Sequence, residues 1–403
     1  MIREFTIENF KSIESLTLPL GRVTVLIGEN GAGKSNVLEA MAFFGSAVHN
    51  KLDAEFLVAR GVRVCANTSI LTAFESKPSS WKKNSFQVGA RGGKDLIKLI
   101  ISDLSQLENG ESGWAASTGE PLYKDRKWGV LEKRWMKYFN AGDDEKLKTQ
   151  PKTKQERLRW MQFLEKLASE TQRAEKKLKT ATKLLSTPFV IYSPENTALR
   201  TFESESQMRP LGVRGEGLFK LVQYLAKHQP AKFKLLRKEL KLFDWFEDFA
   251  IPKRLGIGES RLEIKDRFLA AKRLLDQRSA NEGFLFLLFY LCLFLSPQTP
   301  KFFAIDNIDA SLNPKLCAEM MRRLVALAKQ EDKQVIITTH NPAILDGLDL
   351  TDKEQLLYAI QRDEKGRTIA QRIPAPKPQR GEPALKLSHA YLRGLLGGVP
   401  KNF

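Results

Sequence analysis

Three short apolar runs without polar alternation lie far apart along the chain, at Val23–Ile27, Phe302–Ile305 and Gln334–Thr338. Runs of this length, rich in β-branched and aromatic residues, are typical of inner strands of a parallel sheet, which helices cover on both faces. Polar residues follow each run, and the carboxyl ends of parallel strands meet at one edge of the sheet. The pattern therefore predicts an α/β fold with a functional site at that edge.

One longer apolar segment, Gly283–Leu295, carries no charged residue. It is shorter than the roughly 20 residues that a membrane-spanning helix needs. It also lies directly before the second buried strand. We therefore expect a buried helix behind the sheet, and no membrane partner.

The rest of the chain is more polar. Residues 152–186 place apolar side chains at weak heptad spacing, which predicts one long helix with a lysine-rich outer face. Residues 199–280 are predicted to be mostly helical, with an edge strand at Arg261–Lys265. Towards the C-terminus the pattern predicts a hairpin within 358–370 and a helix near Leu387–Leu396.

The first buried strand runs into a phosphate-binding loop. Residues Gly28–Ser35 fit the Walker A pattern G-x-x-x-x-G-K-[ST], and a helical segment, Asn36–Met41, follows. Backbone N–H groups of such a loop surround phosphate oxygens, and the helix N-terminus adds partial positive charge. Lys34 is expected to reach the β- and γ-phosphates, and the Ser35 hydroxyl to contact Mg²⁺. The expected nucleotide contacts come from Asn30, Gly31, Ala32, Gly33, Lys34 and Ser35.

The other two buried strands end in residues that complete such a site. Asp306 follows Phe302–Ile305 and suits a Walker B aspartate, which holds the magnesium shell. His340 follows the next strand, so it is expected to face the γ-phosphate. The predicted metal ligands are Ser35 and Asp306.

These motifs and their spacing resemble ABC-type ATPases of the SMC/RecF/OLD group, within the bacterial AAA-family ATPases. The resemblance rests on the opening strand and turn at Ile2–Ile13, the loop and helix at Gly28–Met41, a D-loop at Asp309–Pro314, and a switch-histidine loop at Thr338–Pro342. It covers about the first 50 residues and the chain from about residue 190 onward. It implies binding of ATP with Mg²⁺.

The resemblance also implies a signature motif before Walker B, best matched by Asn281–Phe284. The family usually has Ser in the place of Asn281, so the motif is degenerate. In this group the signature faces the γ-phosphate held by another protomer, which implies a homodimer formed head-to-tail around ATP. The residues expected to contact the partner's nucleotide are Asn281, Glu282, Gly283 and Asn313.

Asn307 departs from the family pattern, because ABC-type ATPases carry a catalytic Glu directly after the Walker B aspartate. A carboxylate accepts a proton from the attacking water, whereas an amide only orients it. Three alternatives stay open. Asn307 positions water and hydrolysis is slow; Asp309 or Glu282 supplies the base; or the ATP-bound state matters more than turnover. We favour slow hydrolysis, with Asn307, His340 and Asp309 as the catalytic candidates.

The composition favours a polyanionic partner. Sixty-five Lys and Arg residues against 47 Asp and Glu give a net charge of +18, which suits contacts to the phosphates of DNA or RNA. Tyr123–Trp128 and Lys133–Tyr138 interleave aromatic and basic residues, a mixture that suits stacking on bases or amphipathic packing. An acidic protein partner is the alternative. The three scattered cysteines predict reduced thiols and a cytoplasmic protein.

Together these observations predict an ABC-type ATPase head, with a P-loop sheet, an antiparallel β subdomain, a helical lobe and a basic, largely helical insertion. The expected units are residues 1–50, 51–187, 188–350 and 351–403. The expected function is slow, ATP-dependent action on or sensing of nucleic acid, with DNA as the favoured form, in bacterial anti-phage defence with a separate nuclease or toxin effector. The alternative is a non-hydrolysing, ATP-dependent scaffold that sequesters a partner protein.

Overall fold

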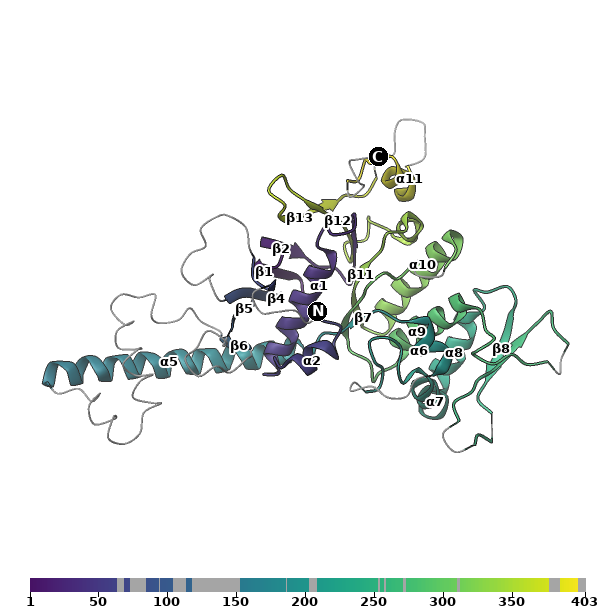
Figure 1. The fold of residues 1–403 in the computed structure, drawn as a ribbon, viewed down its shortest axis with the longest axis horizontal. Coiled ribbons are helices and arrows are strands. Elements are labelled where there is room, and N and C mark those ends of the chain that lie inside the picture. The colour runs from purple at the N-terminus through teal and green to yellow at the C-terminus, as the bar shows by residue number, and fades with distance from the viewer. Residues whose placement is uncertain are drawn as a thin grey trace.

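The computed structural model describes residues 1–63, 69–72, 85–93, 95–103, 114–117, 153–185, 187–202, 209–252, 254–256, 259–270, 273–309, 312–376 and 385–397. Within these residues, two sheets enclose a helix, a lobe of helices covers the far face of one sheet, and one long helix projects from the body (Figure 1). The predicted α/β class is confirmed.

The central sheet has six strands in the order β13-β12-β3-β11-β10-β7. Their bounds are β3 Val23–Ile27, β7 Ile191–Tyr192, β10 Phe302–Ile305, β11 Gln334–Thr338, β12 Gln355–Arg362 and β13 Thr368–Ile373. All neighbouring pairs are parallel except β12 with β13. The three predicted inner strands are confirmed as β3, β10 and β11, and every residue in them is buried.

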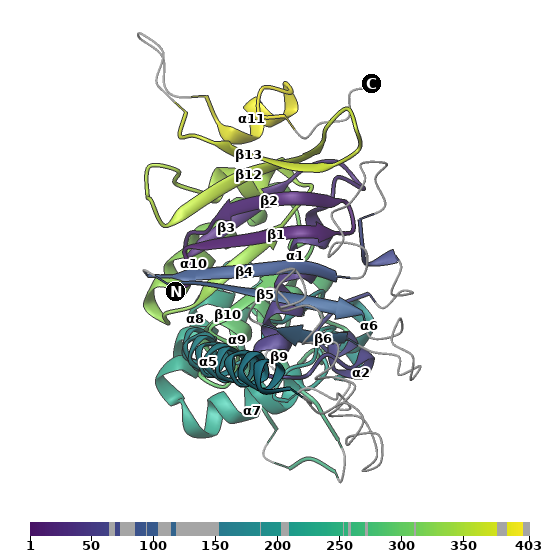
Figure 2. The ribbon, with the colours of Figure 1, turned by 90° about the vertical axis from the view of Figure 1, so that its left-hand side faces the viewer.

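The second sheet has five antiparallel strands in the order β2-β1-β4-β5-β6 (Figure 2). Their bounds are β1 Glu4–Phe10, β2 Ile13–Pro19, β4 Ser85–Gly92, β5 Asp95–Asp103 and β6 Trp114–Ser117. Strands β4 to β6 lie within residues 51–187, where the sequence predicted mainly helix. Phe86, Val88 and Ala90 alternate into the core, and β4 pairs with β1 far along the chain. The division of the chain into four units stays a prediction.

Helix α1 (Lys34–Val48) packs between the two sheets, and all but two of its residues are buried. Its aromatic side chains contact the inner face of the antiparallel sheet, with ring centroids 5.6 Å apart for Phe44 and Phe5 and 5.3 Å apart for Phe43 and Phe86. Such edge-to-face contacts add to the burial of apolar area. They fix the start of α1, and with it the phosphate loop, against both sheets.

The helical lobe covers the other face of the central sheet (Figure 1). It comprises α6 Asn196–Thr201, α7 Leu218–His228, α8 Pro230–Leu240, α9 Glu282–Leu295 and α10 Pro314–Gln330. Helix α9 is the predicted apolar helix, and Gly283 to Leu295 are all buried. In the described part of the chain, no helix is both long and apolar enough to cross a membrane.

A two-stranded sheet in the lobe departs from the mostly helical prediction for residues 199–280. Strand β8 (Phe246–Ala250) pairs antiparallel with β9 (Glu263–Asp266), close to the expected edge strand. Phe246 and Phe249 of β8 are both buried against the lobe, although they are three residues apart, a spacing typical of a helix. A β-bulge between Phe246 and Asp248 places both side chains on the same face of the strand.

Two lysines bind the C-terminal end of α9. Lys333 is 3% exposed and donates to the carbonyls of Ser296 and Thr299, both at 2.9 Å, while Lys232 donates to the Leu295 carbonyl at 3.0 Å. Cations at a helix C-terminus satisfy its free carbonyls and oppose the negative end of the helix dipole. Helix α9 is therefore held firmly at its C-terminal end, far from the predicted signature motif at its start.

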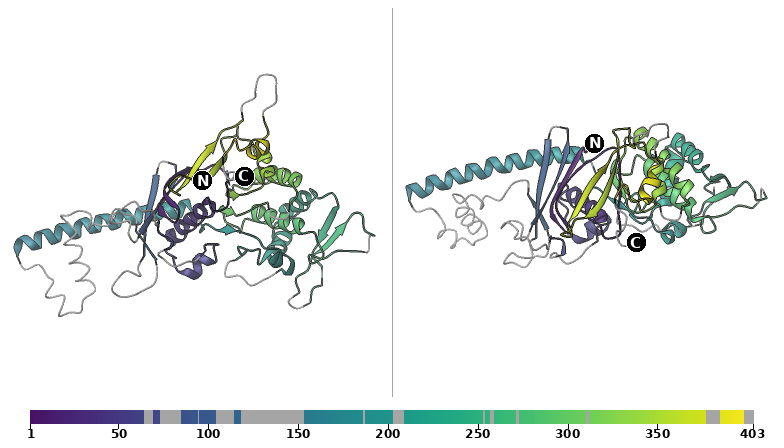
Figure 3. Two further views of the ribbon diagram at one scale, coloured as in Figure 1. Left: turned by 45° about the horizontal axis from the view of Figure 1, so that its top comes forward. Right: turned by 90° about the horizontal axis from the view of Figure 1, so that it is seen from above.

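Helix α5 (Lys154–Leu184) confirms the long helix predicted for 152–186 and projects from the body (Figure 3). Leu158 and Met161 near its outer end are 58% and 59% exposed, and Lys176, Lys179 and Lys183 are exposed along it. The short helix α2 (Ala54–Val58) lies near its inner end (Figure 1). The predicted basic–aromatic segments Tyr123–Trp128 and Lys133–Tyr138 lie outside the described residues.

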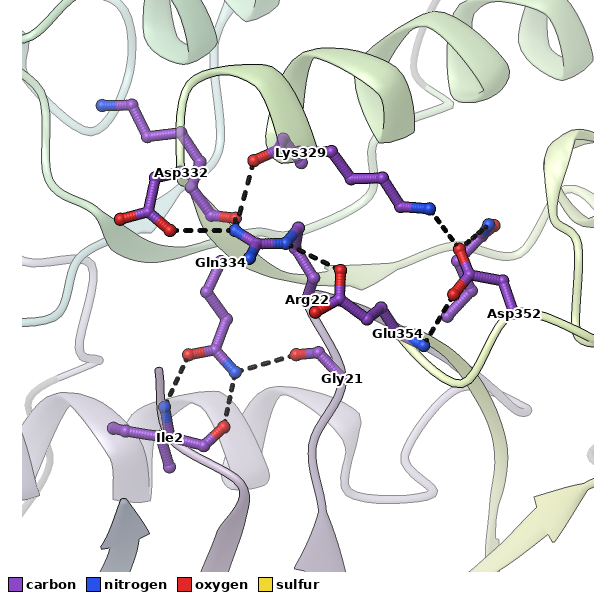
Figure 4. Close-up of polar contacts among 11 residues, drawn as sticks. Ile2, Gly21, Arg22, Lys329, Asp332, Gln334, Asp352 and Glu354 are labelled. Carbon is purple, nitrogen blue, oxygen red and sulfur yellow. Dashed lines mark hydrogen bonds and ion pairs between the residues drawn. The ribbon is translucent and has the colours of Figure 1, made fainter. Parts of the chain in front are cut away.

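At the amino ends of the central strands, a polar network joins the two sheets (Figure 4). The Gln334 amide accepts from the Ile2 N–H at 2.9 Å and donates to the carbonyls of Ile2 and Gly21 at 2.7 and 2.8 Å. Arg22 donates to Glu354 at 3.0 Å and to Asp332 at 3.1 Å. The bonds of Gln334 satisfy buried backbone groups that no strand pairs, and these bonds of Arg22 join side chains.

The C-terminal elements confirm the predicted hairpin and helix. Strands β12 and β13 form the hairpin, and α11 (Leu387–Leu392) follows. Helix α11 packs on the 3-10 helix η4 (Pro342–Gly347), and Ser388 bonds both carboxylate oxygens of Asp346 at 3.0 and 2.7 Å. The C-terminus thus covers the segment that directly follows the predicted switch histidine.

Candidate functional site: a phosphate loop at the carboxyl edge of the sheet

The loop between β3 and α1 requires glycine at two positions where atoms of other segments come very close to its backbone. Gly28 and Gly33 have φ of +151° and +107°. A Cβ atom at Gly33 would lie 2.2 Å from the Thr368 hydroxyl oxygen, and one at Gly28 would lie 2.2 Å from the Ile360 carbonyl oxygen. Gly33 caps α1, so the loop delivers its last N–H groups directly to a helix N-terminus. This backbone matches the phosphate cradle predicted from the sequence.

Lys34 is the cation of this loop. Its ammonium donates to the carbonyls of Gly28 and Glu29 at 2.9 and 3.1 Å, and the residue is 6% exposed. Burial lowers the pKa of Lys34, although Asp306 and Glu29 oppose the effect. The side chain folds back over the loop, so its charge lies where a bound phosphate would neutralise it.

Ser35 and Asp306 meet as predicted. The Ser35 hydroxyl donates to one carboxylate oxygen of Asp306 at 3.4 Å, and the Thr338 hydroxyl donates to the other. Hydroxyl and carboxylate oxygens are hard ligands of the kind that Mg²⁺ prefers. The pair therefore fits the magnesium site expected for this motif, with Thr338 orienting the carboxylate.

Asn307 follows Asp306 in a left-handed conformation, with φ +55°. Its backbone N–H donates to the Thr338 hydroxyl oxygen at 2.9 Å, and its side chain is exposed. Asn adopts this region more readily than most residues do. The exposed amide can orient a water molecule but is not a general base.

Asp309 and His340 lie at the neighbouring strand end. The Asp309 carboxylate accepts from the Thr339 hydroxyl at 2.5 Å, which ties the D-loop to the end of β11. His340 is exposed, yet the surrounding loops partly desolvate its ring; this desolvation and the charge of Lys34 lower its pKa. A neutral imidazole is therefore favoured beside the phosphate loop. Asn341 then caps η4 by accepting from Ala343 at 2.9 Å.

The predicted signature residues lie elsewhere, on a pocket of about 880 Å³ that we call the signature pocket. Asn281 and Gly283 of α9 line it together with Asn313 at the start of α10 and Trp245, and no residue of the phosphate loop does. Asn281 is exposed and its side chain caps nothing, whereas Asn313 caps α10 by accepting from Leu316 at 2.9 Å. Glu282 is half-buried at the start of α9.

The structure thus brings Lys34, Ser35, Asp306, Asp309 and His340 to one edge of the sheet, and groups Asn281, Gly283 and Asn313 on another surface.

Sequence reasoning gave no role to Thr338, which bonds both Asp306 and the N–H of Asn307. Its place two residues before the switch histidine was the one signal available.

Comparison with known proteins identifies the family of this chain. The sequence profile of the family described as "AAA domain, putative AbiEii toxin, Type IV TA system" matches residues 23–346, from β3 to η4. The chain belongs to this AAA-domain family. The match spans the phosphate loop, the Walker B strand and the switch histidine. The resemblance stated from the motifs is confirmed.

Other similarities are more limited in extent or in identity. A stretch of 41 residues is 42% identical to an "OLD nuclease" of Thermus scotoductus; it amounts to 10% of this chain and 8% of that protein. A crystal structure of an SMC head bound to the C-winged helix domain of ScpA covers 92% of this chain and 98% of its own, with 13% identity and a TM-score of 0.50. The SMC head domain from Thermotoga maritima has 12% identity, covers 93% and 99%, and has a TM-score of 0.45.

This AAA-domain protein therefore has the fold of an SMC head. Its AAA-domain family is a class of ATPases that uses nucleotide and typically Mg²⁺.

Proposed function

We propose that the protein binds ATP with Mg²⁺ at Gly28–Ser35 and Asp306, hydrolyses it slowly, and pairs with a second copy in the ATP-bound state. The observation that carries this proposal is the cluster at the carboxyl edge of the sheet, where Ser35 and Thr338 both bond Asp306 and Lys34 lies over the loop. These residue types at these positions serve phosphate binding in P-loop proteins.

Each group has a distinct task in this proposal. The N–H groups from Asn30 to Ser35 and the Lys34 ammonium bind the phosphates, and Ser35 with Asp306 holds the metal. Mg²⁺, when bound, neutralises charge on the phosphate oxygens. Thr338 keeps the Asp306 carboxylate oriented.

Slow turnover is supported by Asn307, whose exposed amide stands where the family's catalytic glutamate belongs. Asn307 orients the attacking water in this proposal, and His340 contacts the γ-phosphate from the same protomer. Asp309 is the second candidate for the base, because its carboxylate lies close enough to His340 to affect the pKa of the imidazole. It ranks second because that carboxylate already accepts a hydrogen bond from Thr339.

Pairing of two copies is supported by the signature pocket. Asn281 and Gly283 stand at the start of a firmly held helix, and the Asn281 side chain makes no cap bond there. A helix N-terminus favours an anion. In a head-to-tail dimer, this surface receives the nucleotide held by the partner's phosphate loop.

The substrate class we propose is nucleic acid, with DNA as the favoured form, in anti-phage defence beside a separate nuclease or toxin effector. A net charge of +18 supports a polyanionic partner. The matched family is described as a putative toxin of a Type IV TA system, and the Thermus relative as a nuclease. The alternative, an ATP-dependent scaffold that does not hydrolyse ATP, keeps the same nucleotide site.

Replacing Lys34 tests the nucleotide site. We expect Lys34→Ala to weaken ATP binding by about 100-fold or more, because it removes the charged donor of the loop. Isothermal titration calorimetry measures the affinity, and Lys220→Ala, a change of an exposed lysine on α7, is the matched control. Unchanged ATP affinity in Lys34→Ala, with a normally folded protein, would refute the assignment.

Salt dependence tests the nucleic-acid proposal. For about six phosphate contacts, DNA affinity should fall on the order of 10³-fold between 50 and 200 mM salt. Reversing Lys176 and Lys179 on α5 to Glu should weaken binding further, and fluorescence anisotropy with a labelled duplex measures both effects. Binding that ignores salt, or no binding, would favour the scaffold.

A further inference from the structure

The hairpin β12–β13 forms one wall of the phosphate loop, although it lies beyond residue 346, where the family match ends. Strand β12 pairs with β3, and the phosphate loop starts directly after β3, so the hairpin lies beside the loop. The Ile360 carbonyl approaches Gly28 so closely that only glycine fits there. The loop is thus built against a segment from the far end of the chain.

Two side chains of this hairpin bond successive carbonyls of the loop. The Arg362 guanidinium donates from Nε to the Gly31 carbonyl at 3.0 Å, and the Thr368 hydroxyl donates to the Ala32 carbonyl at 2.9 Å. Arg362 also donates to the Gly366 carbonyl in its own turn, which holds the guanidinium in place. Thr368 is 1% exposed, so its hydrogen bond is shielded from water.

The hydroxyl of Thr368 is fixed by a chain of donors. Asn36 on α1 donates to the Ser12 hydroxyl oxygen at 2.7 Å, and the Ser12 and Thr368 oxygens are 2.7 Å apart. Because the single Thr368 proton goes to Ala32, the Ser12 hydroxyl must donate to Thr368. Strand β1's turn, helix α1 and the hairpin therefore share one network that ends on the loop.

Bonding these carbonyls orients the N–H groups that belong to the same peptide units. In a planar trans peptide the C=O and the following N–H point in opposite directions. Holding the carbonyls of Gly31 and Ala32 towards the hairpin therefore directs the N–H groups of Ala32 and Gly33 away from it. Consistent with this, the Ala32 N–H points to the Glu29 carbonyl at 3.3 Å, the same oxygen that Lys34 bonds.

We propose that Arg362 and Thr368 are positioning residues of the nucleotide site, which hold two N–H donors of the phosphate loop in the orientation that phosphate needs. This inference rests on the proposed binding of ATP at the loop. A loop fixed before binding loses less conformational freedom on binding, so affinity is higher. The C-terminal hairpin is then part of the nucleotide site.

Four variants and a control test the proposal. Thr368→Val removes the donor at nearly constant shape, and Thr368→Ser restores it. Arg362→Met removes the guanidinium, and Arg362→Lys keeps the charge without the Nε donor. Arg372→Met is the control, because Arg372 is an exposed arginine of the same hairpin that makes no hydrogen bond to the loop in the described part of the chain. Lys34→Ala reports on the loop itself.

Calorimetry with ATP and with ADP, in the presence of Mg²⁺, gives the decisive readout. We expect Thr368→Val to weaken binding about tenfold and Arg362→Met about threefold, in line with a buried and an exposed hydrogen bond. Thr368→Ser and Arg372→Met should stay within about twofold, a difference below one such bond. ATP and ADP should be affected by the same factor, since the loop cradles the phosphates they share.

Each other outcome overturns the proposal in a recognisable way. If Thr368→Val and Arg362→Met bind ATP like the wild type while Lys34→Ala does not bind, the positioning role is wrong and the ATP site stands. If Thr368→Ser weakens binding as much as Thr368→Val, packing rather than the hydroxyl is responsible. A lower melting temperature without a change in affinity would show a purely structural role. Failure of the wild type to bind ATP would refute this proposal and the proposed function together.

Discussion

At the phosphate loop, the polar groups that would handle nucleotide already bond one another, whereas at the signature pocket the Asn281 side chain makes no cap bond. Ser35, Asp306 and Thr338 form one cluster, and Asp309 bonds Thr339. Across the lobe, Asn281 is exposed with a side chain that caps nothing, beside a pocket of about 880 Å³. The first surface is assembled by hydrogen bonds within one chain, and the second is an open pocket that the proposed function assigns to a second copy.

The difference follows from how each surface is built. The phosphate-loop cluster stands on the ends of adjacent parallel strands, so backbone pairing fixes its geometry. The predicted signature residues stand at helix starts, where N–H groups point outward; Asn313 caps α10, whereas the Asn281 side chain makes no cap bond at α9. The proposed function therefore assigns nucleotide binding to the first surface and pairing with a second copy to the other.

The largest effect is expected from Asn307→Glu, which supplies the missing carboxylate on the loop side. General-base assistance is typically worth about 10²- to 10⁴-fold in rate, so the steady-state ATPase rate should rise by about 100-fold or more. Asn307→Gln is the matched control, because it has the length of Glu without the charge, and its rate should stay near that of the wild type.

The opposite result would reassign the base. A brisk wild-type ATPase that Asn307→Ala leaves unchanged would point to another acid. Asp309→Asn and Glu282→Gln would then identify it, since each removes one candidate carboxylate.

The next largest effect is expected on the free energy of unfolding, from a change at the C-terminal end of α9. Lys333→Met leaves the carbonyls of Ser296 and Thr299 without their donor, which should cost about 2 kcal/mol of unfolding free energy. Chemical denaturation measures this loss. ATP affinity should stay unchanged, because Lys333 lies at the amino end of β11 and not at the loop. A loss of ATP affinity in Lys333→Met would show that the C-terminal end of α9 and the phosphate loop are coupled.

The same lysine predicts a pH dependence. Burial lowers the pKa of Lys333 to about 8 from its usual 10.5. Between these values the unfolded chain binds the proton more strongly than the folded one. Unfolding free energy of the wild type should therefore rise with pH from about 8 to about 10.5. Lys333→Met should lack this rise, and denaturation at several pH values tests it.

The smallest effect on ATP binding itself is expected from Asn281→Arg, on the exposed signature surface. ATP affinity should change by less than about twofold, which is below one ordinary hydrogen bond. ATP-dependent pairing in analytical ultracentrifugation should be lost, with turnover falling to whatever a single copy sustains. If Asn281→Arg pairs and turns over normally, the signature pocket takes no part in the dimer.

The parts of the site that the sequence predicted are those with local patterns. The glycines of the loop, Lys34 and Ser35 lie in one continuous motif, and Asp306 and His340 directly follow apolar strands. Parallel pairing then brings these strand ends together by a general rule. Hence fold class and the loop cluster could be predicted without knowledge of contacts.

The parts that were missed depend on distant pairing. Strands β4 and β5 join the sheet through β1, and nothing within residues 85–103 indicates that partner. Arg362 and Thr368 are ordinary residues of a hairpin, and their role arises from the approach of β12 to β3. Such contacts leave no local signal, because only the folded sheet defines them.

The placement of β3 has a consequence for synthesis. This strand, which carries the phosphate loop, pairs on one side with β11 and on the other with β12, both near the end of the chain. A nascent chain emerging from the ribosome therefore exposes a largely apolar strand with both edges open until residue 362 has emerged. Open apolar edges invite aggregation. Holding β3 until its neighbours arrive is a task suited to a chaperone, and the phosphate loop has its complete surroundings only after the hairpin β12–β13 has emerged.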